Sequence, residues 1–279
     1  MKLGVSIRLM GEASTRDTIR ACAISAEEAG LDELWVPDHI AIPPDDAEGS
    51  NGRYLDPLAS LAWLAACTNR IGLGTGVLVL PYRPALPTAK WIATIQELSE
   101  GRVRLGVGVG WMQAEFDALG LNRRHRGRLT DRHLDLIRRC FSAEDDVVTE
   151  NGQPFLFRPH PTTPPIFIGG HGDHALERTI QFGDGWMPMT TDPERLAPEI
   201  AKLREKAVSA TRSMPEVVCL GDLADADPAR GAARLHALAE IGVTRVLTGG
   251  RYQNHNEFQR IIEGVVAVRE AAGSIETSP

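Results

Sequence analysis

Short apolar segments alternate with longer amphipathic segments along the whole sequence, and this repeat limits the possible folds more than any other feature. The apolar segments, predicted as strands, are Lys2–Ile7, Glu33–Pro37, Ile71–Val77, Val103–Val109, Pro165–Gly169, Gly185–Met189, Glu216–Gly221 and Thr244–Thr248. The amphipathic segments, predicted as helices, are Ser14–Ala29, Asp56–Cys67, Arg83–Ser99, Ala114–Leu119 with Arg126–Phe141, Asp173–Phe182, Pro193–Thr211, Pro228–Glu240 and Asn254–Ala272. Apolar strands with little alternation are typical of a parallel sheet buried on both faces. Eight strand–helix units therefore predict an α/β fold, a (β/α)₈ TIM barrel.

Three stretches depart from the repeat. Ile42–Tyr54, rich in Pro, Asp and Gly, follows the second strand, and Gly120–His125 separates two helical pieces after the fourth. Val147–Phe157, around Asn151-Gly152, predicts a β-hairpin. The barrel is therefore predicted to carry insertions after strands two and four. No linker of different composition divides the chain, so residues 1–279 are predicted to form a single domain.

Composition excludes several classes of protein. The net charge of −7 argues against a nucleic-acid binder, which usually has a basic surface. No apolar run approaches the ~20 residues that a membrane span needs. The cysteines are Cys22, Cys67, Cys140 and Cys219, and their spacing fits no metal site. Scattered cysteines and an N-terminus that begins directly as a strand predict a reduced, cytoplasmic protein.

Two candidate catalytic residues follow the second strand. Functional side chains of such barrels lie on the loops after the strands. Asp38 and His39 end the segment Trp35-Val36-Pro37-Asp38-His39, which places an acid and a titratable base at the barrel mouth. Histidine can give or take a proton near neutral pH. The alternative is that Asp38 caps a loop and His39 packs beneath it.

Glycines end the third and fourth strands. Gly76 lacks a Cβ, so a flat ligand can approach its backbone closely, or the residue merely fits the narrowing barrel. Gly106-Val107-Gly108-Val109-Gly110-Trp111 is not a dinucleotide fingerprint, because its third glycine comes one position early. Gly108 and Gly110 leave room for a planar ring. Trp111 either walls that ring or fills the core.

The fifth strand leads into Gly169-Gly170-His171-Gly172-Asp173 and then a helix. A glycine-rich turn into a helix N-terminus presents free N–H groups and a partial positive charge, which suits a cofactor phosphate. Two alternatives remain open: Asp173 caps the helix itself, or the glycines only form a turn.

A metal site is a competing hypothesis. His171 and His174 are three residues apart and can share a helix face, with Asp38 or His39 as a further ligand. Such a site needs three or four ligands. The first strand ends in Ser6-Ile7-Arg8 and adds no histidine, so no metal site is predicted.

Taken in order, the motifs resemble the luciferase-like monooxygenase superfamily, and within it the branch of coenzyme F420-dependent oxidoreductases. The resemblance runs from residue 1 to about residue 270. Its landmarks are Trp35 to His39, Leu73 to Arg83, Lys90 to Arg102, Gly106 to Trp111 with Glu115-Phe116, Arg126 to Asp131, Gly169-Gly170, and Gly183 to Trp186.

The resemblance implies a bacterial luciferase-like barrel with a cofactor ring lying across the strand ends. It implies a non-prolyl cis peptide bond at Gly76-Val77 behind the ring, Asp38 and His39 beside its reactive face, and the cofactor phosphate on the turn after strand five. The residues expected to bind the cofactor are Asp38, Gly76, Val77, Gly108, Gly110, Trp111, Gly169, Gly170, His171 and Gly172.

The implied function is that of an oxidoreductase transferring hydride between a small organic substrate and the deazaflavin coenzyme F420. His39 is the expected proton donor or acceptor, with Asp38 orienting it or contacting the ring, and Ile42–Tyr54 the expected substrate lid. The alternatives are an FMN-dependent monooxygenase using reduced flavin and O₂, and a flavin-binding barrel without catalysis. Relatives are often dimers, so a homodimer is a further expectation. Some relatives carry a catalytic glutamate after the fourth strand, where this chain has Trp111, and Glu115 lies four residues further on.

Overall fold

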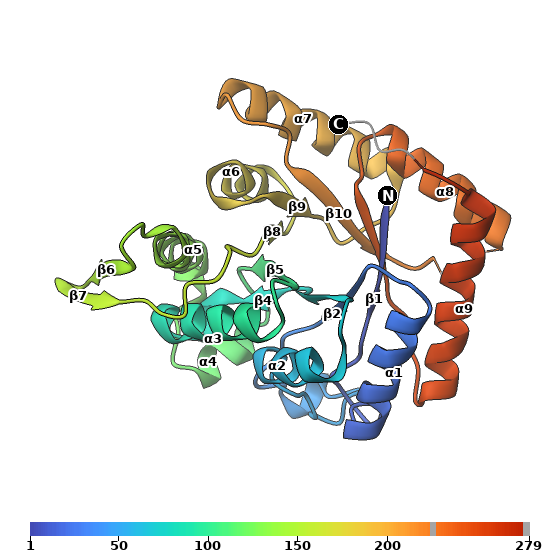
Figure 1. Cartoon of the computed structure of the whole chain (residues 1–279), viewed down its shortest axis with the longest axis horizontal. Helices are drawn as coiled ribbons and strands as arrows, with labels where there is room; N and C mark the ends of the chain where they lie inside the picture. The colour runs from blue at the N-terminus through green and yellow to red at the C-terminus, as the bar shows by residue number, and fades with distance from the viewer. Residues whose placement is uncertain (224–226, 276–279) are drawn as a thin grey trace.

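The computed structural model describes residues 1–223 and 227–275, and its strands form a closed parallel barrel (Figure 1). The strands are β1 (Lys2–Ser6), β2 (Glu33–Val36), β3 (Gly72–Thr75), β4 (Leu78–Val79), β5 (Val103–Gly108), β6 (Val147–Glu150), β7 (Gln153–Leu156), β8 (Ile166–Gly169), β9 (Gly185–Met187), β10 (Glu216–Gly221) and β11 (Arg245–Thr248). The order around the barrel is β1, β2, β3, β5, β8, β9, β10, β11, and pairing of β11 with β1 closes the ring. These eight parallel strands confirm the predicted fold class.

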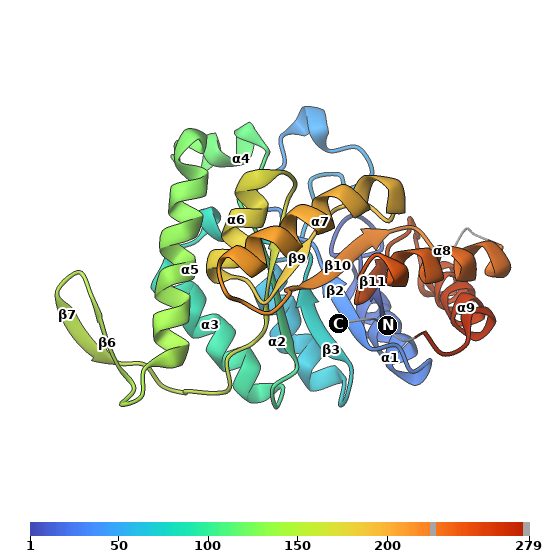
Figure 2. The same ribbon diagram turned by 90° about the horizontal axis from the view of Figure 1, so that it is seen from above.

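Helices follow the barrel strands and cover the outside of the barrel (Figures 1 and 2). The helices are α1 (Arg16–Glu28), η1 (Pro44–Asp46), α2 (Pro57–Cys67), η2 (Leu80–Tyr82), α3 (Ala85–Leu98), α4 (Gln113–Ala118), η3 (Arg123–His125), α5 (Arg126–Ser142), α6 (Asp173–Phe182), α7 (Pro193–Ser209), α8 (Pro228–Glu240) and α9 (His255–Ala272). Local sequence sets their starts. At α2, for example, Asp56 Oδ1 accepts from the N–H groups of Leu58 and Ala59 at 2.9 and 3.0 Å.

The third predicted strand, Ile71–Val77, is shorter than expected. β3 ends at Thr75, the Gly76–Val77 peptide bond is cis, and the chain resumes at Leu78–Val79 as β4. β4 pairs with β5 and adds a short extension to the barrel rim. The hydrophobic pattern missed this break because every residue from 71 to 79 is apolar or small, whereas the family resemblance implied a cis bond at this position.

The inside of the barrel is filled by a tryptophan packed against glycines. Trp35 is buried and makes an edge-to-face contact with Phe167, with ring centroids 5.8 Å apart. A Cβ added to Gly74 would lie 2.3 Å from Trp35 Cδ2, and one on Gly106 would lie 2.0 Å from the carbonyl oxygen of Thr75. Neither position has room for a side chain, so the packing of the barrel interior requires glycine at both.

Charged residues fill the N-terminal end of the barrel. The buried Glu33 carboxylate accepts from Trp35 Nε1 and Arg104 Nε, each at 3.2 Å, and pairs with Arg245. Arg245 Nε also donates to Glu216 Oε2 at 2.7 Å. Burying these charges is tolerated because each is paired and hydrogen-bonded.

Both predicted insertions are present. Residues 37–56, which include η1, follow β2, and they lie at the same end of the barrel as α4 (Figure 2). β6 and β7 form the predicted antiparallel hairpin, which projects away from the barrel in both views. Its turn residues Asn151 and Gly152 have φ of 51° and 78°, as a tight hairpin requires.

The cysteines form no disulfide: all four are free, and burial raises the pKa of the Cys219 thiol to about 12. Within residues 1–223 and 227–275, no helix combines the length and apolar character needed to cross a membrane.

Gly74→Ala tests the packing of the barrel interior. Its Cβ would collide with the rigid Trp35 ring, so we expect the free energy of unfolding to fall by about 1–3 kcal/mol. Gly127→Ala in α5 is the matched control, because its Cβ would approach only the flexible end of Arg178, at 3.4 Å. Alanine favours a helix by up to about 1 kcal/mol, so this control keeps or gains stability. Equal stabilities of both variants in urea denaturation would contradict the packing argument.

Candidate active site at the barrel mouth

A cavity of about 530 Å³ lies at the mouth of the barrel. Its walls come from the C-terminal ends of the strands and the loops after them, where barrel enzymes hold their ligands. The lining residues are Ser6, Pro37, Asp38, His39, Gly76, Val77, Val79, Tyr82, Gly108, Val109, Gly110, Trp111, Glu115, Gly169, Gly170, His171, Met189 and Leu220. Every site residue predicted from the sequence is among them except Gly172. The volume lies in the range of small-molecule and cofactor sites.

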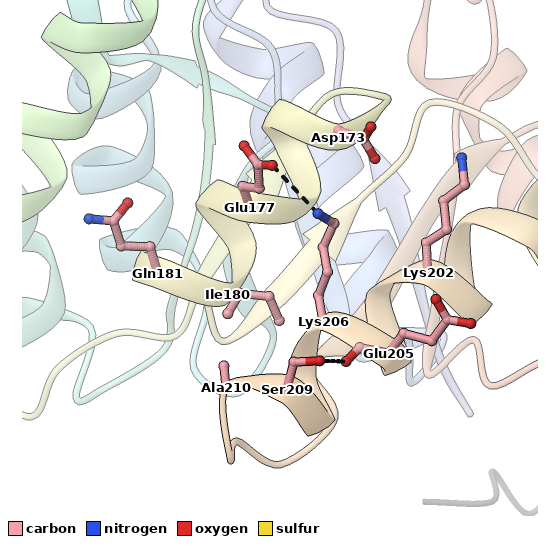
Figure 3. A pocket seen from close by; sticks show the side chains of 9 residues that line it. All are labelled: Asp173, Glu177, Ile180, Gln181, Lys202, Glu205, Lys206, Ser209 and Ala210. Atoms are coloured by element: carbon pink, nitrogen blue, oxygen red, sulfur yellow. Dashed lines mark hydrogen bonds and ion pairs between the residues drawn. The ribbon is translucent and has the colours of Figure 1, made fainter.

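A second hollow, of about 610 Å³, lies on the outer surface between α6 and α7 (Figure 3). Lys206 Nζ lies 3.5 Å from Glu177 Oε1 there, so charges across the groove neutralise one another. None of the predicted site residues lines this groove. The predicted catalytic side chains, Asp38 and His39, line the cavity at the barrel mouth instead.

The buried carboxylate of Glu115 in α4 holds His39. Glu115 Oε2 lies 3.1 Å from His39 Nδ1 and accepts from Tyr82 Oη at 2.7 Å. Its Oε1 accepts from the N–H groups of Ile40 and Ala41 at 2.6 and 3.1 Å. Burial favours the neutral acid, but these hydrogen bonds outweigh it and lower the pKa of Glu115 to about 2.

The ionised Glu115 fixes the state of the His39 ring. A carboxylate only accepts hydrogen bonds, so the His39 Nδ1 must carry a proton. In the neutral imidazole, Nε2 then keeps a lone pair. No described residue bonds to Nε2, and the ring lines the cavity. His39 is therefore arranged to exchange a proton through Nε2 with a molecule in the cavity.

Asp38 has a different role from the one predicted. Its buried carboxylate forms a bidentate pair with Arg83, at 2.6 and 2.9 Å, and accepts from the N–H of Val79 at 2.8 Å. Arg83 also reaches Asp56 at 2.7 Å. The prediction that Asp38 orients His39 is wrong, because the Asp38 carboxylate bonds to Arg83 and Val79 while the His39 ring bonds to Glu115. The alternative, that Asp38 contacts the cofactor ring, stays a prediction, since Asp38 also lines the cavity. Glu115 orients the ring, and Asp38 ties the loop after β2 to the chain around β4.

Val77 fills the space beside two of the predicted ring-binding glycines. A Cβ on Gly108 would lie 2.6 Å from Val77 Cγ2, and one on Gly169 would lie 2.8 Å from Val77 Cγ1. The Val77 side chain therefore lies between the two glycines and occupies the space that a Cβ on either of them would need. A Cβ on Gly76 would meet nothing closer than Trp35, at 3.7 Å. These are ordinary contacts, so Gly76 is less tightly packed than Gly108 and Gly169, and it lines the cavity where a flat ring would lie.

Aromatic and apolar side chains form the upper wall. The Trp111 side chain is 66% exposed and lies edge-on to the His39 ring, with centroids 6.2 Å apart. The Tyr54 ring packs on His39 from the loop after β2, at 5.0 Å. Ile40 and Met189 are also about half exposed. Trp111 is thus part of the cavity wall, and the alternative of a core residue is excluded.

The turn after β8 has the geometry of an anion site. Gly170 and Gly172 have φ of 130° and 74°, values that other residues rarely adopt. Gly172 is the N-cap residue of α6, and no side chain caps this helix. Asp173 is the first helical residue and does not cap it. The N-terminus of α6 therefore keeps N–H groups that no side chain caps, and the phosphate site there stays a prediction.

The metal hypothesis gains no support. His174 is almost fully exposed and faces Glu177 at 3.6 Å. Across the described ranges, no three His, Cys, Asp or Glu side chains come together as metal ligands.

Sequence reasoning missed Glu115, Tyr82 and Tyr54. Glu115 and Tyr82 stand within the landmark segments that carry the family resemblance, but their spacing to His39 gives no pairing signal. Tyr54 ends the predicted lid loop and packs directly on His39. The only available signal was an acid next to Phe116 at the start of an amphipathic helix.

Comparison with known proteins agrees with this geometry. The family model described as luciferase-like monooxygenase matches residues 3–275. An uncharacterized protein of Mycobacterium tuberculosis is 31% identical over 82% of this chain and 83% of its own length. The F420-dependent hydroxymycolic acid dehydrogenase of the same organism is 32% identical over 68% of this chain and 53% of its own length.

Solved structures share the fold. Monooxygenase RslO1 from Streptomyces bottropensis superposes with a TM-score of 0.78 at 18% identity, covering 95% of this chain and 98% of that one. An F420-dependent secondary alcohol dehydrogenase, in complex with an F420-acetone adduct, gives 0.73 at 20% identity and covers 96% and 99%. The match of the family model over nearly the whole chain shows that the protein belongs to the luciferase-like monooxygenase family.

Proposed function

We propose that this protein is an oxidoreductase that transfers hydride between a small organic substrate and coenzyme F420 held at the barrel mouth. The observation that carries the proposal is the His39–Glu115 pair beside a cavity whose floor is the break at Gly76-Val77. Similarity to the F420-dependent dehydrogenase of Mycobacterium tuberculosis supports this choice of cofactor.

The residues at the mouth fit such a group. The cavity lined by Gly76 and Val77 suits the ring, and the turn Gly169–Gly172 with the uncapped α6 suits its phosphate. When bound, a deazaflavin accepts or donates a hydride at its ring. The protein then has to hold ring and substrate face to face and exclude water.

His39 supplies the proton transfer in this proposal. An alcohol that loses hydride must also lose its hydroxyl proton, and Nε2 of neutral His39 can take it. The charged imidazole that results lies against the Glu115 carboxylate, which stabilises it. In the reverse direction the same Nε2–H returns the proton to a carbonyl oxygen.

A second candidate is an FMN-dependent monooxygenase that uses reduced flavin and O₂. Trp111 favours it, because this residue stands where some F420-dependent relatives carry a catalytic acid. The fold likeness to monooxygenase RslO1 is compatible with this candidate as well. Oxygen consumption that depends on reduced flavin is the measurement that distinguishes the two.

Titration with both cofactors, oxidised and reduced, tests the cofactor site directly. We expect one of them to bind with a Kd well below about 1 mM, followed by its absorbance and fluorescence. Riboflavin is the matched control for FMN: if the turn after β8 holds the phosphate, riboflavin binds at least about tenfold more weakly. If neither F420 nor FMN binds below about 1 mM, the proposed function is wrong.

His39→Ala tests the proton transfer. Removing a general acid or base lowers kcat by about 10²–10⁴-fold, while cofactor affinity stays nearly unchanged because Gly76 and the phosphate turn are intact. His174→Ala, with a side chain 96% exposed, is the control and keeps full turnover. Steady-state kinetics on substrates found by screening alcohols and ketones provides the measurement. Unchanged turnover of His39→Ala would remove His39 from this role.

Glu115→Gln tests how much the ionised Glu115 carboxylate contributes to the stability of the fold. The Glu115 pKa of about 2 is below its ordinary value of 4.5. Its ionised form therefore stabilises the fold fully above pH 4.5, and this stabilisation is lost as the pH falls toward 2. We expect the variant to lose about 1.5–3 kcal/mol of unfolding free energy at pH 7.

The difference from the native protein should shrink as the pH falls below 4.5, measured by urea denaturation at each pH. Glu177→Gln, an exposed acid on α6, is the control and changes stability little. A difference that stays constant down to low pH would show that Glu115 is not held as an anion.

A further inference from the structure

A separate cavity of about 450 Å³ opens beside the ring cavity, at the ends of β1 and β11. Its lining residues are Arg8, Met10, Glu48, Gly49, Gly250, Arg251 and Gln253. Two arginines therefore face a hollow at the mouth of a protein whose net charge is −7. Neither the cofactor turn nor the His39–Glu115 pair contributes to it.

Arg8 is fixed in place by contacts that leave its charge unpaired. Its backbone N–H donates to the hydroxyl of buried Tyr252 at 2.8 Å, and its guanidinium lies 6.0 Å from the centre of that ring. Nη2 donates to the carbonyl oxygen of Gly49 at 3.3 Å. Nε is buried and has no hydrogen-bond partner. A buried N–H without a partner costs free energy unless a ligand or water completes it.

No carboxylate neutralises the two arginines. In the described parts of the chain, neither Arg8 nor Arg251 takes part in an ion pair, and exposed Glu48 on the same rim pairs with neither. Two other arginines with little exposure do have acidic partners: Arg83 pairs with Asp38, and Arg245 pairs with Glu216. The arginine pair is therefore free to bind an anion.

A thin wall separates this cavity from the ring cavity. Tyr54 packs on His39 at 5.0 Å between centroids, and its hydroxyl donates to Met10 Sδ at 3.3 Å. A Cβ on Gly249 would lie 3.8 Å from Ser6 Cβ, so the β11 loop also adjoins the ring cavity. The side chain of Tyr54 therefore links His39, which lines the ring cavity, to Met10, which lines the arginine cavity.

Arg8 lies across the mouth from the expected phosphate turn, and Arg251 follows β11, which is three strands from β8. In the order around the barrel, β8 is four strands from β1, which is the greatest separation that eight strands allow. A cofactor whose phosphate is bound after β8 cannot place that same phosphate at Arg8. An anion bound by Arg8 and Arg251 has to come from a different group.

We propose that Arg8 and Arg251 bind an anionic group of the substrate, a carboxylate or a phosphate. The substrate is then a small organic acid or phosphate ester whose alcohol or carbonyl carbon reacts beside His39. This inference rests on the proposed function for the reaction, but the anion site itself can be measured without turnover. Arginine is suited to both anions because its planar donors match their oxygens in pairs.

The first experiment titrates the cofactor-loaded protein with inorganic phosphate at low ionic strength, by calorimetry. Loading fills the turn after β8, so the remaining phosphate site is the one at Arg8 and Arg251. We expect Arg251→Gln and Arg8→Gln each to weaken phosphate binding by about tenfold. Arg251 is exposed, so its variant should fold normally even if Arg8→Gln does not. Arg124→Gln, an exposed arginine of η3, is the control and leaves phosphate binding unchanged.

The second experiment compares substrate pairs that share a reacting alcohol or ketone and differ only in carrying a carboxylate or a neutral amide. Arg251→Gln should raise KM for the acid by about tenfold, leave kcat nearly constant, and not affect the amide.

Three results would overturn the proposal. The first is a loaded protein that binds no phosphate. The second is an Arg251→Gln variant that binds it as the native protein does. The third is an Arg251→Gln variant with a lower affinity for the cofactor, together with no phosphate binding to the native protein once the cofactor is loaded. That result would assign the cavity to the cofactor's own acidic tail. If no cofactor binds but the arginine-dependent phosphate site remains in the unloaded protein, the proposed function fails and the anion site stands.

Discussion

One buried anion organises the mouth of this barrel. The Glu115 carboxylate in α4 receives donors from the loop after β2 and from Tyr82 in η2, so it joins three segments of the chain at one point. Removing a carboxylate from water is costly, and here four hydrogen bonds offset that cost. Because burial and the acidic partner also raise the pKa of Tyr82, its hydroxyl stays a donor. The position of His39 follows from this arrangement.

Asp38 is the complement of Glu115 on the other side of the same loop. The two neighbouring side chains have different partners, Arg83 for Asp38 and Glu115 for His39. Asp38 pairs with Arg83, whose pKa is raised by the carboxylates of Asp38 and Asp56 despite its burial. His39 points toward the cavity. Asp38 therefore holds the loop after β2 in place, and His39 is positioned to face a ligand.

The sequence predicted what depends on local pattern. Strand–helix alternation predicted the barrel, and Asn151-Gly152 predicted the hairpin. Ten of the eleven site residues named from the sequence and the family resemblance line one cavity. Contacts between distant segments were not predictable: Glu115 is separated from His39 by 76 positions, and no periodicity links them. Gly108 was predicted to leave room for a cofactor ring, but the Val77 side chain lies where its Cβ would be. This contact between distant segments is visible only in the folded chain.

The charges around the mouth follow from how the barrel orders its strands. Parallel strands point the same way, so the residues after each strand gather at one rim even when they are far apart in sequence. The acids Asp38 and Glu115 are neutralised there by Arg83 and by hydrogen-bond donors. Arg8 and Arg251, by contrast, take part in no ion pair in the part of the chain described here, and Arg8 Nε has no hydrogen-bond partner. In a protein of net charge −7, long-range forces repel anions. Attraction for an anion at this side of the mouth must then come from this local pair, at distances short enough that salt screens it only in part.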